Sequence, residues 1–404
     1  MFAGGSGRRV PSAAPGPWLR LTALAGAAAT LLAVISGAGD LGTAHRLLAA
    51  LALPPLVALV AGAFVAHRRL VAPSVAALAL FGAAALVTQP ALHLVLAASS
   101  LAATLAACAV AFRGDPVPAG SARDYVTLTK PRIMSLLLLT GAAGMFAGAQ
   151  GLPSARVLVL GLVGLALACG GASALNHVLD RDIDRAMGRT RGRPVAAARV
   201  PAPRALEFGL ALSAFSFVLL ASTVNVLTAA LALVGNLFYV LVYTGWLKRS
   251  TPQNIVIGGA AGAVPPVVGW AAATGDVALP ALFLFLIVFF WTPPHFWALA
   301  LLIKRDYAAA GIPMLPVVRG DRATARQILG YTVALVAVTL VPFAAGSFGR
   351  VYAAAAVALG AAFVWLAWRL LAETTPARAR TAFHFSLAYL ALLFAAAAAD
   401  PFLR

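Results

Sequence analysis

The chain has 404 residues, of which 62% are hydrophobic and only 10% charged, and its mean hydropathy is +0.93. A soluble domain carries about 45–50% apolar and about 25% charged residues, so this composition excludes an ordinary soluble enzyme and predicts an integral membrane protein. The formal charge of +18 does not indicate a nucleic-acid partner, because the basic residues lie in short segments between apolar stretches, as cytoplasmic loops do.

Apolar stretches long enough to cross a bilayer as helices, about 20 residues each, recur along almost the whole sequence. Unpaired strand edges cannot be satisfied in lipid, so we expect an all-α integral membrane protein with about thirteen transmembrane helices. The predicted spans are 19–38, 44–66, 70–88, 91–112, 133–151, 155–179, 205–223, 225–246, 254–273, 279–302, 327–347, 350–371 and 382–399.

The positions of the basic residues support these spans. With the N-terminus inside, every Lys and Arg falls in an inner segment except Arg46, Arg156, Arg350 and Arg404. This asymmetry predicts a multi-pass protein of the cytoplasmic (inner) membrane whose N-terminus and polar inner loops are cytoplasmic. We expect the first apolar segment to be retained as a span, because it is long and no clear small-residue cleavage site follows it.

The long polar stretch "RGDPVPAGSARDYVTLTKPR" separates four predicted spans from nine. We therefore expect a four-helix N-terminal domain over 1–113, a cytoplasmic linker over 114–132 that also begins the next domain, and a nine-helix domain over 133–404.

His45 and His93 lie near the outer ends of the second and fourth predicted helices, at similar depth. Such a placement permits bis-histidine ligation of haem within a bundle, and it equally permits two structural histidines hydrogen-bonded at the interface. The four-helix part weakly resembles half of a haem A synthase, which would imply bound haem b and haem A synthase as a partner. Leu41 and Gly42 stand where that family's catalytic half has an acidic residue, so an oxygenating role is not implied.

The stretch "NHVLDRDIDRAMGRTRGRP", residues 176–194, follows directly on an apolar run. Asn176, Asp180 and Asp184 are spaced i, i+4, i+8, so on a helix they drift by only about 40° per step and share one face. Two carboxylates and an amide are oxygen donors that suit Mg²⁺. Asp182 points the other way, and we expect it to be solvated.

Arg189 and Arg193 follow in the same loop, and arginine suits bidentate contacts with phosphate. The pattern therefore predicts a metal and diphosphate site at the membrane surface. The alternative is a basic cytoplasmic loop whose aspartates only balance its charge. Acidic residues near lipid are costly and usually functional, which favours the site for the Asn176–Asp180–Asp184 spacing.

Two further inner segments, "YTGWLKRSTPQN" and "WTPPHFWALALLIKRDYAAAGIPMLP", bring polar side chains to the same membrane face. His295 lies within a span near that face, where it could contact haem or be a buried histidine hydrogen-bonded to a neighbouring helix. The candidate residues of these segments are Lys248, Arg249, Asn254, His295, Lys304, Asp306 and Tyr307.

These three segments resemble the signature blocks of the protohaem IX farnesyltransferases, the haem O synthases of the UbiA prenyltransferase superfamily. "DYVTLTKPRIMSLLLLTGAAGMF" resembles the start of that family's domain. The resemblance covers about residues 120–400, and the family's nine helices match the predicted number. The N-x-x-x-D-x-x-x-D block marks the superfamily, whereas the two later blocks mark its haem branch.

The resemblance implies Mg²⁺-dependent transfer of a farnesyl group from farnesyl diphosphate to a vinyl group of haem b, giving haem O for haem A and cytochrome oxidase biogenesis. It implies Asn176, Asp180 and Asp184 as metal ligands. Asp180, Asp184, Lys304 and Asp306 would act in catalysis. The substrate-binding residues would be Asn176, Arg189, Arg193, Lys248, Arg249, Asn254, His295 and Tyr307. Many superfamily members have a second D-x-x-x-D pair, whereas Asp306 is followed by Tyr307 and Ala310.

Two other functions are compatible with parts of the pattern. Another UbiA-type prenyltransferase would act on a quinone or chlorophyll precursor, but "RSTPQNIVIGGAAGAVPP" and "DYAAAGIPMLP" favour the haem branch. A membrane transporter would place its charges near the bilayer midplane, whereas these aspartates lie at one membrane face.

Overall fold

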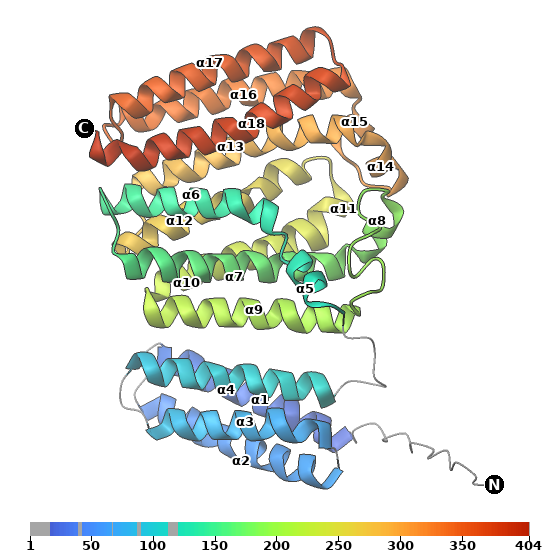
Figure 1. Ribbon diagram of the computed structural model, residues 1–404, viewed down its shortest axis with the longest axis vertical. Coiled ribbons are helices and arrows are strands. Elements are labelled where there is room, and N and C mark those ends of the chain that lie inside the picture. Colours follow the sequence, from blue (N-terminus) through green and yellow to red (C-terminus); the bar gives the residue numbers. More distant parts are fainter. Residues whose placement is uncertain (1–16, 39–42, 67, 87–89, 112–119, 404) are drawn as a thin grey trace, which may run out of the picture. The chain divides into compact units, whose positions relative to one another are not determined.

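The computed structural model describes residues 17–38, 43–66, 68–86, 90–111 and 120–403. This described part is helical and contains no β-strand. It divides into two compact units, Met1–Val117 and Pro118–Arg404 (Figure 1). The expectation of an all-α fold is therefore confirmed.

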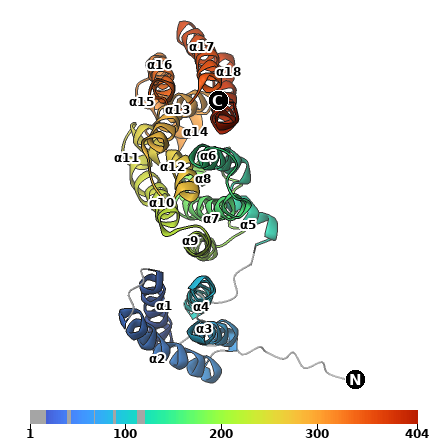
Figure 2. The ribbon, with the colours of Figure 1, turned by 90° about the vertical axis from the view of Figure 1, so that its left-hand side faces the viewer.

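The N-terminal unit is a bundle of four long helices (Figure 2). Its core consists largely of leucine and alanine, with Leu19, Leu59 and Leu70 fully buried. The side chain of His45 lies outside the described residues, whereas Nδ1 of His93 lies 2.7 Å from the carbonyl oxygen of Ala84. The helices are α1 (Pro17–Ala38), α2 (Thr43–Ala66), α3 (Arg68–Leu86) and α4 (Pro90–Ala111).

In the C-terminal unit, nine helices are long and apolar enough to cross a membrane, counted over the described residues. Helix α13 is central, because it packs against α12, α16 and α18. The nine are α6 (Pro131–Ala149), α7 (Ala155–Leu179), α9 (Ala202–Thr223), the continuous segment Val226–Ser250, α12 (Asn254–Thr274), α13 (Leu279–Leu302), α16 (Asp321–Ala344), α17 (Arg350–Ala372) and α18 (Pro376–Ala399).

Five short helices gather at one end of this unit (Figure 1). Hydropathy did not predict them, because they are too short and too polar to register as spans. The first occupies part of the expected linker and begins with a capping box, in which the backbone N–H of Ser121 and of Asp124 each donate to the other residue's side chain. They are α5 (Ala122–Leu128), α8 (Arg181–Ala186), α11 (Lys248–Ser250), α14 (Lys304–Ala309) and α15 (Leu315–Val318).

The segment Val226–Ser250 contains an unusual π-helix. Helix α10 (Val226–Leu237) continues as η1 (Phe238–Leu247), ten residues of π-helix, before α11. The apolar pattern predicted a span over 225–246 but not this wider winding. Extended π-helix is rare, and π-helical turns are frequent at functional sites. The π-helix changes the angular positions of Thr244 and Lys248 relative to a regular α-helix.

Helices α6 and α12 approach closely because glycines line their contact. A Cβ atom on Gly144 would overlap the carbonyl group of Pro266, and one on Gly269 would overlap the carbonyl oxygen of Gly141. Small residues that allow close backbone approach are typical of helix pairs in membranes. The two prolines of α12 therefore pack against glycines of α6.

Gly144→Ala is expected to destabilise the C-terminal unit by about 1–3 kcal/mol, the usual cost of overpacking, because the opposing atoms are backbone. The thermal unfolding midpoint in detergent measures this loss. The matched control is Gly262→Ala on α12, where a Cβ meets nothing within 4 Å. That variant should be neutral or more stable by up to about 1 kcal/mol through helix propensity. Equal midpoints for the two variants would contradict the close packing.

Candidate active site

The charged stretch after α7 does not continue as one helix. Helix α7 ends at Leu179, Asp180 has φ −89° and ψ 6°, and α8 begins at Arg181. The prediction that Asn176, Asp180 and Asp184 share one helix face is corrected here, because Asp184 lies on α8. The i→i+4 hydrogen bonds nevertheless persist through the break, from Asp180 N to Asn176 O at 2.8 Å and from Asp184 N to Asp180 O at 2.7 Å.

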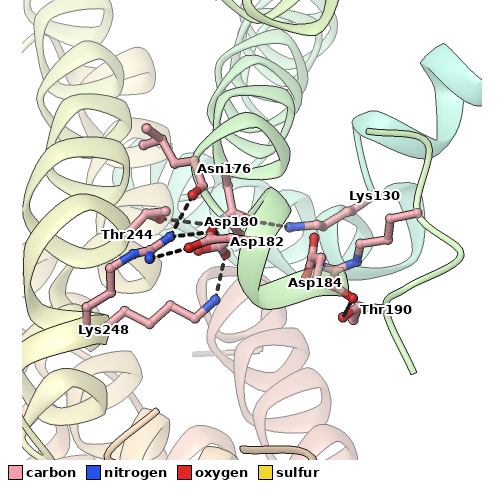
Figure 3. Close-up of polar contacts among 11 residues, drawn as sticks. Lys130, Asn176, Asp180, Asp182, Asp184, Thr190, Thr244 and Lys248 are labelled. Carbon is pink, nitrogen blue, oxygen red and sulfur yellow. Dashed lines mark hydrogen bonds and ion pairs between the residues drawn. The ribbon is translucent and has the colours of Figure 1, made fainter. Parts of the chain in front are cut away.

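A chain of polar contacts links three distant segments at this break (Figure 3). The Lys130 ammonium donates to Oδ1 of Asn176 at 2.7 Å. Nδ2 of Asn176 donates to Oδ2 of Asp180 at 2.7 Å and to Oγ1 of Thr244 at 3.1 Å. The Lys248 ammonium donates to the same Asp180 oxygen at 2.6 Å. The Asn176 amide is thus oriented by a cation on one side and a carboxylate on the other.

The other oxygen of Asp180 has no partner. Asp180 is 1% exposed, and its Oδ1 is a buried acceptor without a hydrogen bond. Buried acceptors are nearly always satisfied, so this oxygen points to a ligand that the protein alone does not supply. A hard cation is a suitable ligand, because it prefers carboxylate and amide oxygens.

Asp184 and Asp182 have different partners although both belong to α8. Asp184 is buried, and both of its carboxylate oxygens accept from the Arg193 guanidinium at 2.8 and 2.9 Å. Asp182 is exposed and pairs with Arg249, whose second amino group donates to the Leu179 carbonyl. Hydrogen bonding from Arg249 lowers the pKa of Asp182. Arg249 is therefore directed toward the surface pair, away from Asp180.

Lys130 is a site residue that the sequence analysis missed. Its backbone has φ 51° and ψ 60°, a left-handed conformation that is rare outside glycine. Burial, with the neighbouring charges of Arg193 and Lys248, lowers the pKa of Lys130 to about 7. Strained backbone tends to occur at functional sites. The sequence feature that could have indicated this role is the position of Lys130, directly before Pro131 at the start of a span.

The third predicted segment reaches the cluster in part. Oδ1 of Asp306 lies 3.7 Å from the position that a Cβ on Gly188 would occupy, so α14 approaches the loop after α8. Tyr307 is buried in the same apolar cluster as Ile183, and burial raises the pKa of Tyr307. The structure does not bring Lys304 into the site, because its ammonium pairs with Asp321 at 2.8 Å, where both side chains are exposed.

The remaining predicted residues differ in their surroundings. Arg189 is exposed. Asn254 is fully buried, and Nδ2 donates to the Thr251 carbonyl while Oδ1 has no partner. His295 is buried at the contact of α13 and α18. His177, which the sequence analysis did not select, is also buried, and neither of its ring nitrogens has a hydrogen-bond partner.

The cluster is suited to a metal-bound polyanion. Lys248 pairs with Asp180 and Arg193 with Asp184, and Lys130 adds a third basic side chain at Asn176, so basic groups outnumber carboxylates before any ligand binds. Across the described ranges no group of three or more His, Cys, Asp and Glu residues could hold a metal ion. A cation here would therefore complete its shell with the Asn176 amide, with water and with ligand oxygens, as Mg²⁺ does beside phosphates.

Known proteins resemble the C-terminal unit closely in sequence. Residues 137–393 match the UbiA prenyltransferase family. A protohaem IX farnesyltransferase of Symbiobacterium thermophilum is 54% identical over 280 residues, which are 69% of this chain and 94% of that protein. The one of Chloroflexus aurantiacus is 46% identical over 341 residues, 81% of this chain and 58% of that protein. This second match is longer than 118–404, so it includes part of the N-terminal unit.

Solved structures share the fold of the C-terminal unit. A digeranylgeranylglyceryl phosphate synthase superposes with a TM-score of 0.59 at 17% identity, over 70% of this chain and 99% of that chain. A UbiA homologue from Archaeoglobus fulgidus superposes with a TM-score of 0.52 at 16% identity, over 68% of this chain and 98% of that chain. At such identities the likeness concerns the fold alone.

Lys248→Met is expected to cost about 3–5 kcal/mol of stability, because it leaves the Asp180 carboxylate buried without its cation. Thermal unfolding in detergent without divalent ions measures the loss. Arg249→Met is the matched control: its ion pair with Asp182 is solvated, and such pairs contribute about 1 kcal/mol or less. Equal losses of stability for the two variants would contradict the prediction, because the buried pair of Lys248 and Asp180 would then stabilise the protein no more than the surface pair does.

Proposed function

This chain belongs to the UbiA prenyltransferase family, and we propose that it transfers a farnesyl group from farnesyl diphosphate to a vinyl group of haem b, forming haem O for haem A and cytochrome oxidase biogenesis. The observation that carries the proposal is the buried cluster at the α7–α8 break, where three basic side chains contact Asn176, Asp180 and Asp184 and one carboxylate oxygen of Asp180 is unpaired. Relatives at 46–54% identity that are named protohaem IX farnesyltransferases support the choice of substrates.

The residues present fit Mg²⁺ with a diphosphate. Asn176, Asp180 and Asp184 would hold the ion, because they supply oxygen donors and Oδ1 of Asp180 has no other partner. When bound, Mg²⁺ supplies positive charge that stabilises the negative charge on the diphosphate. Lys130 and Lys248, both placed at the Asn176–Asp180 pair, would bind the diphosphate oxygens from two sides.

The reaction separates charge, and the cluster is arranged to stabilise that charge. The bond between C1 of the farnesyl group and the diphosphate oxygen breaks, and its electron pair leaves with the diphosphate. Lys130, Lys248 and Arg193 already converge on Asn176, Asp180 and Asp184, where the diphosphate would bind, so little reorganisation would be needed. The vinyl group of haem b bonds to C1, and water adds to the resulting cation, releasing a proton to solvent.

Residues of the other inner segments would complete the substrate site. Asp306 would supply a second acidic site from α14. Tyr307 and Asn254 would contact the substrate. Arg189, exposed in the loop after α8, would meet the incoming diphosphate. Lys304 and Arg249 pair with Asp321 and Asp182 in the structure, so a role for them requires that they exchange these partners.

We further place the short-helix end of the C-terminal unit at the cytoplasmic face of the inner membrane, because nearly all basic residues lie in the segments predicted to be inside. The N-terminal unit would bind haem b through His45 and His93, with haem A synthase as a partner. The second candidate acceptor is a quinone or chlorophyll precursor.

Purified full-length protein given haem b, farnesyl diphosphate and Mg²⁺ is expected to form haem O, detected by mass spectrometry. Parallel reactions replace haem b with a quinone precursor, or Mg²⁺ with a chelator. We expect no product in either reaction. Prenylation of the quinone precursor with no haem O would overturn the assignment of the acceptor.

Asp180→Asn and Asp184→Asn are each expected to lower kcat/KM for farnesyl transfer by at least about 100-fold, because each removes a carboxylate that stabilises the metal-bound leaving group. The same haem O assay, run as a function of Mg²⁺ concentration, measures the loss. Asp182→Asn is the matched control on the same short helix, and it should stay within about threefold of the parent, since surface ion pairs contribute little. A larger loss for Asp182→Asn than for Asp180→Asn would contradict the site.

A further inference from the structure

His295 is held in one orientation by aromatic rings on both faces. Its ring stacks on Trp291, with centroids 4.3 Å apart and planes 16° apart, and on Phe383 of α18, at 4.8 Å and 24°. The side chain is 8% exposed, and Phe296 contacts it edge to face. The imidazole therefore has a fixed plane in apolar surroundings.

Its protonation pattern follows from its hydrogen bonds. The hydroxyl of Ser386 donates to the Phe383 carbonyl at 2.6 Å, which uses its single hydrogen. Nδ1 of His295 lies 2.7 Å from the same hydroxyl oxygen, so Nδ1 must be the donor. A neutral ring with its proton on Nδ1 carries a lone pair on Nε2.

The Nε2 atom is available to a ligand. The structure gives it no hydrogen-bond partner, and among the described residues it is not one of the side-chain atoms that are both fully buried and unpaired, so part of its surface is accessible. Both nitrogens of His177, by contrast, belong to that set. An imidazole whose N–H is held by a second residue and whose other nitrogen is free has the arrangement found for histidines that bind metals.

A single nitrogen donor selects the kind of metal. A bare ion needs several protein ligands, and the described residues contain no group of three or more His, Cys, Asp and Glu residues that could supply them. The iron of a metalloporphyrin already has four nitrogen ligands and needs only an axial one, which histidine supplies in many haem proteins. The flanking aromatic rings keep the surroundings of this nitrogen apolar, as an apolar macrocycle requires.

We propose that Nε2 of His295 is the axial ligand to the iron of the porphyrin substrate, and that Ser386 is a positioning residue that holds the required tautomer. This assignment rests on the proposed function, in which a metalloporphyrin is the acceptor. Ligation to α13 would fix the distance and rotation of the porphyrin, and hence which edge faces the prenyl donor.

The test uses the full chain with His45→Ala and His93→Ala, so that haem in the N-terminal unit cannot contribute. Haem b and metal-free protoporphyrin IX are titrated separately in detergent, and ferrous haem is examined by resonance Raman for an iron–histidine stretch. We expect His295→Ala and His295→Gln to remove that stretch and weaken haem b binding at least about tenfold. Their affinity for metal-free protoporphyrin should stay near the parent value, which also reports folding.

Two further variants separate ligation from packing. Ser386→Ala should shift the iron–histidine stretch and weaken haem b binding by about tenfold, since it removes the hydrogen-bond partner of Nδ1 and leaves the imidazole in place. His384→Ala is the matched control, because His384 is exposed on the same turn of α18 and contacts the ring of Phe383 edge to face; its removal should leave the iron–histidine stretch unchanged. Imidazole added to His295→Gly should restore a histidine-type spectrum.

The assignment is overturned if the parent shows no histidine ligation, if the His295 variants keep it, or if His177→Ala removes it instead. Equal weakening of haem b and metal-free protoporphyrin would also overturn it, because that result indicates packing alone. Haem O formation is measured in the same samples. Product with unaltered ligation in the His295 variants refutes only this assignment, whereas His295-dependent ligation without product refutes only the proposed transferase activity.

Discussion

The burial of the Asp180 carboxylate is the constraint on which the inner end of the C-terminal unit depends. A charge that is 1% exposed must be compensated within the protein, and its compensation comes from segments far apart in the sequence. Lys248 pairs with it directly, while Lys130 reaches it through the amide of Asn176. The ends of three long helices are thus held together by polar contacts.

Local distortions of the backbone position the side chains that make these contacts. Lys130 has a left-handed backbone conformation at the start of α6, Asp180 interrupts α7, and the π-helix η1 precedes Lys248. Each departs from regular α-helix, and each lies at a residue of the polar chain. Such departures are unfavourable alone, so their gathering at one place indicates that the buried cluster determines them.

The sequence predicted the spans well, because apolar length is a strong one-dimensional signal. Helices α7 and α13 have the predicted bounds, and α12 differs by one residue. The choice of partners was harder to predict: Lys248 and Arg249 are adjacent, yet one reaches Asp180 and the other Asp182. That choice depends on helical phase, which the π-helix changes without any mark in the hydropathy. The partner of Lys304 could not be predicted either. It pairs with Asp321, and the sequence alone does not determine how these two segments lie relative to each other.

The two parts of the proposed site follow from the same physical boundary. Charged groups are stable where lipid gives way to water, and the cluster of aspartates and cations lies at the helix ends. A neutral imidazole in aromatic surroundings requires no water, and His295 lies within α13, eleven residues before Asp306 of α14. One continuous segment therefore carries a residue of each part. The charged diphosphate of the farnesyl donor would bind at the polar helix ends, and the flat apolar porphyrin would bind beside His295. Their reacting groups would therefore meet between the polar helix ends and the apolar core.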